Sequence, residues 1–100
     1  MYEDHYQRID FLHGVLLARG QGGQLTSAFT VVNEVEASLK ADGLLGPLEC
    51  LRVNAARGAL HRRSLRAALV SARGALDAAQ YPPSKYDAEL AAARAKATYC

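Results

Sequence analysis

The chain has 100 residues and a formal net charge of +2, a common size for one domain and too little charge for a binder that is basic over its whole surface. It is rich in the helix formers Ala and Leu, whereas strand-favouring residues are few. No apolar stretch approaches the ~20 residues that span a bilayer, and the acidic start, residues 1–5, differs from a secretory signal. We therefore expect one all-α domain over residues 1–100, in the cytoplasm and without membrane contact.

Apolar residues at intervals of three and four predict a first helix from about residue 2 to residue 19. They are Tyr6, Ile9, Leu12 and Leu16. Gly20 stands at a C-cap position. The glycine-rich residues 21–24 that follow are expected to be the most flexible connector of the chain.

A second helix is expected from Leu25 or Thr26 to residue 41. Its apolar stripe consists of Ala28, Phe29, Val32, Val35 and Leu39. The run 29–32 also fits a strand, but the helical spacing persists over four turns, so we prefer a helix. Thr26 or Ser27 can supply the N-cap oxygen, and residues 42–43 should end the helix.

The third helix should open with Pro47 at its tolerated first position, and its inward face is predicted to be Leu48, Leu51 and Ala55. The fourth helix has the clearest apolar spacing, with Leu65, Leu69, Ala72, Leu76 and Ala79. A single continuous rod would place Arg62 in the core, where an unpaired charge is costly. We therefore expect a break or kink between residues 58 and 64.

Residues 81–83, Tyr-Pro-Pro, should stop the fourth helix. Residues 84–87 resemble a capping box, and a last helix is expected from about residue 85 to residue 98. The predicted fold is thus a compact bundle of about five short helices.

Charge is distributed unevenly along the chain. Residues 1–50 carry three basic and seven acidic groups, whereas residues 51–100 carry nine basic and three acidic groups. At 100° per residue, Arg62, Arg66 and Arg73 fall on one side of the fourth helix. Together with Arg63 they form a candidate anion- or partner-binding surface. A solvated face, or pairing of these arginines with acids of the first half, explains the same pattern, and no interleaved aromatic residue supports base stacking.

The acidic side offers a second candidate surface. Glu34, Glu36 and Asp42 lie in or next to the second helix. Because Glu34 and Glu36 do not share a narrow face, this surface is diffuse. It can meet a basic groove on another protein, and ordinary solvation is the alternative reading.

No pattern in the sequence predicts catalysis, a metal site or a cofactor. His5 and His13 are about 12 Å apart along a helix axis, too far to share one metal ion, and no clustered zinc-ligand motif occurs. Cys50 and Cys100 are expected to be free thiols, with Cys50 in the core; a bridge between them is the alternative. We expect a protein that is not an enzyme and acts by surface contact.

From the Met-Tyr-Glu-Asp-His-Tyr start to the Thr-Tyr-Cys end, the chain resembles the small phage-encoded anti-CRISPR proteins that block type I surveillance complexes. The resemblance lies in a compact chain of this length without enzymatic motifs. It implies an inhibitor in the host cytoplasm that binds a nucleoprotein effector complex and blocks target DNA loading. That group has no common signature, so the resemblance assigns no functional residue.

Three functional hypotheses follow. The first is a protein-binding inhibitor whose acids, Glu34, Glu36 and Asp42, occupy a basic, DNA-handling groove on the effector complex. The alternative is a small nucleic-acid-binding regulator that uses the basic helix and binds in a salt-sensitive way. The third is a helical module that forms homodimers through the small residues of its later helices.

Overall fold

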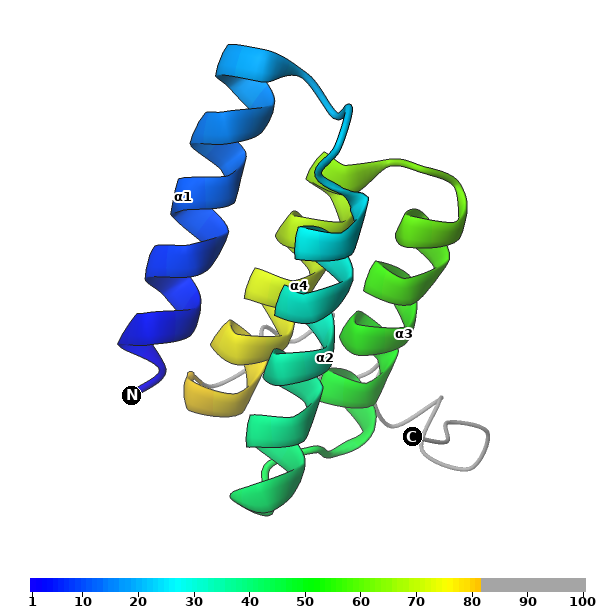
Figure 1. Cartoon of the computed structure of the whole chain (residues 1–100). Helices are drawn as coiled ribbons and strands as arrows, with labels where there is room; N and C mark the ends of the chain where they lie inside the picture. Colours follow the sequence, from blue (N-terminus) through cyan, green and yellow to red (C-terminus); the bar gives the residue numbers. More distant parts are fainter. Residues whose placement is uncertain (82–100) are drawn as a thin grey trace.

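Four helices make up residues 1–81, the part of the chain that the computed structural model describes (Figure 1). They are α1 (Glu3–Arg19), α2 (Leu25–Ala41), α3 (Pro47–His61) and α4 (Leu65–Gln80). The expected all-α bundle is therefore confirmed, and each of these helices lies within a residue or two of its predicted bounds. The helix expected over residues 85–98 lies outside the described residues.

The helices α2, α3 and α4 pack against one another, and α1 covers only α2 and α4 (Figure 1). Every buried side chain among residues 1–81 is hydrophobic. The largest fully buried ones come from all four helices: Ile9, Leu39, Leu60, Leu65, Leu69, Leu76, Val32, Val35 and Val53. The stripes predicted for the second and fourth helices are confirmed except at Phe29 and Ala79, which are half-buried and pack against the core. None of the helices described is long and apolar enough to cross a membrane.

The inward face predicted for the third helix is wrong in part. Leu48 is buried, but Leu51 is only half-buried and Ala55 is exposed. The buried row of α3 instead runs through Val53, Ala56 and Leu60. Small residues in this row let α3 approach α4 closely, and packing against α2 and α4 selects this face over the neighbouring one.

The break predicted between residues 58 and 64 is confirmed, because α3 ends at His61 and α4 begins at Leu65. The amide of Ser64 donates to Ala59 O at 2.8 Å, and the amide of Arg63 donates to Leu60 O at 3.0 Å. These two bonds form a Schellman motif, with Arg63 at the left-handed position (φ 61°). Glycine normally occupies this position because it has no Cβ to strain.

The end of α2 shows the same motif with glycine. Leu44 N donates to Leu39 O at 2.8 Å, Gly43 N donates to Lys40 O at 3.2 Å, and Gly43 has a φ of 71°. The predicted ends at Gly20 and at residues 42–43 are thus confirmed. The chain uses glycine for one Schellman motif and arginine for the other, so Arg63 is an exception within its own sequence.

The expected N-cap of the second helix is wrong. The N-cap is Gln24, whose side chain makes no capping bond, and Thr26 and Ser27 lie within the first turn. Helix α4 likewise has no cap from the side chain of Ser64. Instead, the Leu65 amide donates to Gln21 Oε1 at 2.8 Å. The connector between α1 and α2 therefore helps to cap α4 and holds the starts of α2 and α4 at one end of the bundle.

Candidate functional site

The three acids proposed as a partner surface join helices to one another. Glu34 accepts a bond from Arg8 of α1, and Glu36 accepts one from Arg57 of α3. Asp42 accepts the hydroxyl of Tyr2 at 2.5 Å. These acids face three different contacts between elements and do not converge on one site. Each already has a partner within the protein, which leaves less of its charge for another molecule.

Arg73 differs from the other predicted arginines because its side chain contacts α1. Its Nη1 atom donates to Asp10 of α1 at 2.5 Å, and its guanidinium lies 5.0 Å from the ring centroid of Tyr6. Pairing with acids of the first half, one of the two alternative explanations, thus accounts for Arg73 and Arg57. An exposed pair such as Arg73–Asp10 contributes about 0–1 kcal/mol, so it orients α1 more than it stabilises it.

Arg62, Arg63 and Arg66 are exposed, and none of them forms an ion pair with any residue of 1–81. The same holds for Arg19, at the end of α1, which the sequence analysis did not single out. We call the end of the bundle that carries these four arginines the basic end. It is the end where α1 and α3 stop and where α2 and α4 start (Figure 1).

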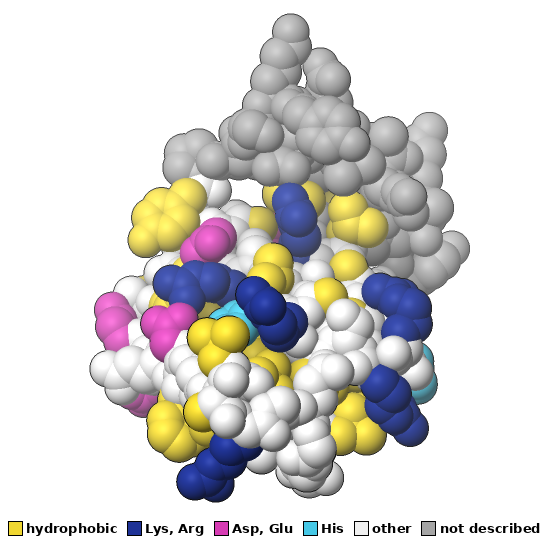
Figure 2. All heavy atoms as spheres, turned by 90° about the horizontal axis from the view of Figure 1, so that it is seen from above, with side chains coloured by type: hydrophobic (Ala, Val, Ile, Leu, Met, Phe, Trp, Pro, Cys, Tyr) yellow, Lys and Arg dark blue, Asp and Glu magenta, His cyan; other side chains and the backbone are white. Residues whose placement is uncertain are grey.

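The basic end is free of acids in the sequence that builds it. Residues 11–33 and 50–76 contain no Asp or Glu, and these segments form the halves of α1 and α2 next to the basic end and most of α3 and α4. Figure 2 looks onto this end, with basic side chains spread across the face and acidic ones along one side only. Because successive helices run in opposite directions, the segments without acids lie together at one end of the bundle, and the acidic residues of 1–81 lie toward the other end.

Two helix N-termini, those of α2 and α4, also lie at the basic end. Neither α2 nor α4 has an acid in its first turn or a cap from its N-cap side chain. By contrast, α1 and α3 begin at the other end with Glu3, Asp4 and Glu49 in their first turns. A helix N-terminus carries about half a positive charge. The C-termini of α1 and α3, which lie at the same end, each carry about half a negative charge and offset these dipoles. The positive charge of the basic end therefore comes from its arginines and from the absence of acids in residues 11–33 and 50–76.

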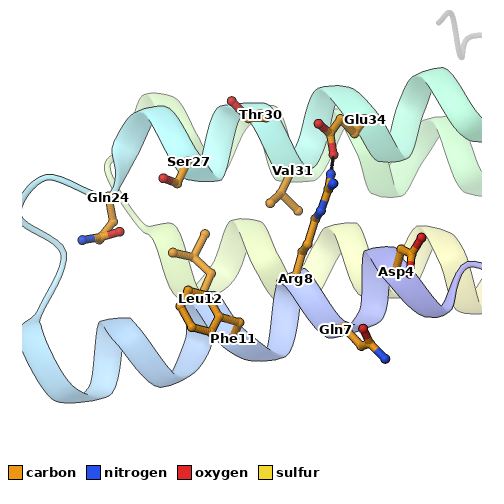
Figure 3. Close-up of a pocket in the computed structure, with 10 residues that line it drawn as sticks. All are labelled: Asp4, Gln7, Arg8, Phe11, Leu12, Gln24, Ser27, Thr30, Val31 and Glu34. Carbon is orange, nitrogen blue, oxygen red and sulfur yellow. Dashed lines mark hydrogen bonds and ion pairs between the residues drawn. The ribbon is translucent and has the colours of Figure 1, made fainter.

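A groove of about 880 Å³ runs between α1 and α2 (Figure 3). It is lined by Asp4, Gln7, Arg8, Phe11, Leu12, Gln24, Ser27, Thr30, Val31 and Glu34. Leu12 and Val31 are buried, whereas Phe11 is 74% exposed. The groove has no histidine or cysteine in its lining. Of its two carboxylates, at Asp4 and Glu34, the one at Glu34 is bound by Arg8, and the groove offers a contact surface.

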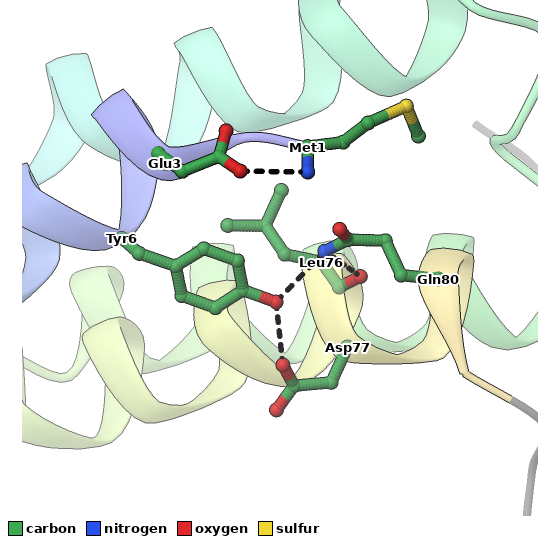
Figure 4. A network of polar contacts seen from close by, with 6 residues as sticks. All are labelled: Met1, Glu3, Tyr6, Leu76, Asp77 and Gln80. Atoms are coloured by element: carbon green, nitrogen blue, oxygen red, sulfur yellow. Dashed lines mark hydrogen bonds and ion pairs between the residues drawn. The ribbon is translucent and has the colours of Figure 1, made fainter.

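A polar cluster fastens the start of α1 to the end of α4 (Figure 4). The Tyr6 hydroxyl donates to Asp77 Oδ1 at 2.5 Å and accepts from Gln80 Nε2 at 2.9 Å. Burial, together with Asp77, raises the pKa of Tyr6 above its ordinary value. Burial and Asp42 raise the pKa of Tyr2 to about 12. Both phenols therefore stay protonated near neutral pH and act as structural donors.

The histidines do not form a site. His5 Nε2 lies 2.8 Å from Ser38 Oγ of α2, while His13 is half-buried and His61 is exposed at the end of α3. Within residues 1–81, no three His, Cys, Asp or Glu side chains are grouped so that they could hold a metal ion.

The expectation of a free thiol at Cys50 is wrong. Cys50 lies in the core as expected, at 6% exposure, but it is disulfide-bonded. The only other cysteine of the chain is Cys100, which lies outside the described residues. Cys50 is therefore not available as a nucleophile in this form of the protein.

No protein-family model matches the chain, and comparisons with curated proteins and with solved structures find no significant match.

Proposed function

We propose that the protein binds the phosphate backbone of nucleic acid through its basic end. One observation carries this proposal: four exposed arginines, Arg19, Arg62, Arg63 and Arg66, form no ion pair with any residue of 1–81 and lie on an end whose helix segments contain no acid. Arginine pairs with phosphate through a planar fork of N–H donors. This proposal takes the alternative hypothesis of the sequence analysis, replaces Arg73 by Arg19 and keeps the other three arginines.

The composition of the basic end favours binding that is independent of sequence. It has no Phe, Tyr or Trp side chain among its arginines on which bases could stack. Phosphate contacts position a protein on nucleic acid but do not read bases. If all four arginines release counterions, the slope of log K against log salt should be about −3.6 on duplex DNA.

The test measures the fluorescence anisotropy of a labelled DNA duplex at about 50 mM salt and at increasing salt. Arg62→Ala and Arg66→Ala should each weaken binding on any sequence and make the salt slope shallower by about 0.9. The matched control is Lys40→Ala, which removes one exposed charge near the end of α2 away from the basic end. Absence of binding at about 50 mM salt, or equal losses in Lys40→Ala and Arg62→Ala, would refute the proposal.

A second candidate is the inhibitor implied by the resemblance, which would bind a type I surveillance complex and block loading of its target DNA. The acidic side chains along one side of the face in Figure 2 favour it, although Glu34, Glu36 and Asp42 do not converge on one site. Co-elution of the protein with a purified complex, together with reduced DNA binding by that complex, is the expected result. Separate elution with undiminished DNA binding would exclude this candidate.

A further inference from the structure

We propose that the groove between α1 and α2 docks a basic amphipathic helix of a partner protein. The groove is a different surface from the basic end, since none of the four arginines lines it. It holds the most exposed aromatic ring among the described residues, that of Phe11. The proposal therefore adds a protein contact to the proposed nucleic-acid contact and does not depend on it.

The apolar part of the groove is suited to an inserted side chain. Leu12 and Val31, which are 4% and 7% exposed, give it an apolar floor, and Phe11 stands at its rim (Figure 3). Ser27 and Thr30 of α2 line the opposite wall. Closing an apolar side chain between Phe11 and Val31 removes apolar surface from water on both partners, which is the main driving force of such contacts.

The charges of the groove select the sign of the partner. Asp4 is exposed and its carboxylate makes no hydrogen bond or ion pair with residues 1–81, while Glu34 is bound by Arg8 across the groove (Figure 3). The lining thus has two acids and one base. Its excess negative charge lies at the Asp4 end, so a complementary partner carries Lys or Arg there.

The shape of the groove selects a helix as the occupant. Both walls are helices whose backbone groups are bonded internally, so no strand edge is present for an extended peptide to pair with. Asp4 and Phe11 are seven residues apart on α1 and lie on the same side, about 10 Å from each other along the axis. A partner helix lying along α1 therefore needs an apolar anchor and a basic residue separated by about two turns.

The test uses model peptides of about five helical turns. The first has Leu anchors and an Arg seven residues away; in the second Glu replaces the Arg, and in the third Gln replaces the anchors. NMR chemical-shift mapping should place the first peptide at Phe11, Leu12 and Val31, and fluorescence anisotropy should rank it tightest. Phe11→Ala should weaken it about tenfold, and Asp4→Asn should weaken the Arg peptide but not the Glu peptide.

Leu17→Ala is the matched control for Phe11→Ala, because Leu17 is also on α1 and is 76% exposed but does not line the groove. Binding should be unchanged in this variant. The proposal is overturned if Leu17→Ala and Phe11→Ala weaken the peptide equally, if the Glu peptide binds as tightly as the Arg peptide, or if the shifts map elsewhere. Shifts at the groove caused by a DNA duplex would also overturn it, because they would make the groove a nucleic-acid surface. Loss of DNA binding in the arginine variants leaves all these outcomes unaffected.

Discussion

Replacing Arg63 by glycine should make the protein more stable. A side chain in the left-handed region costs about 1–2 kcal/mol, and Arg63 has a φ of 61°. Glycine removes this cost but gives the unfolded chain more freedom, which costs about 0.5–1 kcal/mol. The difference between these two costs is about 0–1.5 kcal/mol. Loss of the long bond that Arg63 Nη1 donates to Leu60 O, at 3.3 Å, reduces it further. The expected gain is therefore at most about 1 kcal/mol, or a Tm rise of up to about 8 °C for a domain of this size.

Urea unfolding at constant m-value measures this change. Two variants serve as controls. Arg63→Ala removes the same charge but keeps a Cβ at the strained position, so it should gain little. Gly43→Arg makes the reverse exchange at the other Schellman motif, where a Cβ would meet no atom within 4 Å, and it should lose about 1 kcal/mol. If Arg63→Gly unfolds at lower urea than the parent protein, the strain argument is wrong.

The same variant tests function, because Arg63→Gly should bind duplex DNA more weakly although it is more stable. A variant whose stability and affinity move in opposite directions cannot owe its weaker binding to partial unfolding. A more stable Arg63→Gly protein with unchanged affinity would show that Arg63 is not a phosphate contact, and would leave Arg62 and Arg66 to be judged by their own variants.

Three further predictions concern the scaffold. Tyr6→Phe removes the hydroxyl that donates to Asp77 and should cost about 1 kcal/mol in urea unfolding. Its raised pKa means that Tyr6 stays protonated in the folded protein while unfolded tyrosines ionise near pH 10, so stability should fall as the pH rises above about 10, and less steeply in Tyr6→Phe. Gln21→Ala removes the acceptor of the Leu65 amide and should cost about 0.5–1 kcal/mol, with faster amide exchange at the start of α4. Leu69→Ala, in the fully buried row of α4, should cost about 2–5 kcal/mol by calorimetry, whereas Val70→Ala at 62% exposure should change little.

The helices were predictable because the apolar spacing and the positions of the Gly and Pro residues indicate the same helix boundaries. The face of α3 was not, because its alanines are compatible with two neighbouring faces. Ala55 and Ala56 give the same periodic signal, and only packing against α2 and α4 decides that Ala56 is buried. The cap that Gln21 provides for α4 could not be predicted from local sequence either, because the bond joins residues that are 44 positions apart.

The candidate site was predictable in part. Helical periodicity placed Arg73 with Arg62 and Arg66, but it cannot show that α1 brings Asp10 to within 2.5 Å of Arg73. Arg19 was missed because the charge was counted by halves of the chain. The two segments without acids, 11–33 and 50–76, are the signal that could have found it. In a bundle of alternating helices, such segments meet at one end.

Two local rules of helix stability are broken at the basic end. Arg66 lies in the first turn of α4, where a positive charge opposes the helix dipole at a cost of about 0.3–1 kcal/mol. Arg63 occupies a left-handed position that the chain fills with Gly43 elsewhere. At the other end Glu3, Asp4 and Glu49 follow the dipole rule at the starts of α1 and α3, although Tyr2 there also has a positive φ, of 65°. Departures from local preference tend to gather at functional sites. An anion bound at the basic end should relieve the unfavourable interaction between Arg66 and the dipole of α4, because it neutralises the charge of Arg66. Thermal unfolding with and without a DNA duplex should therefore show a higher Tm for the complex, and a smaller rise when Arg66 is replaced by Ala.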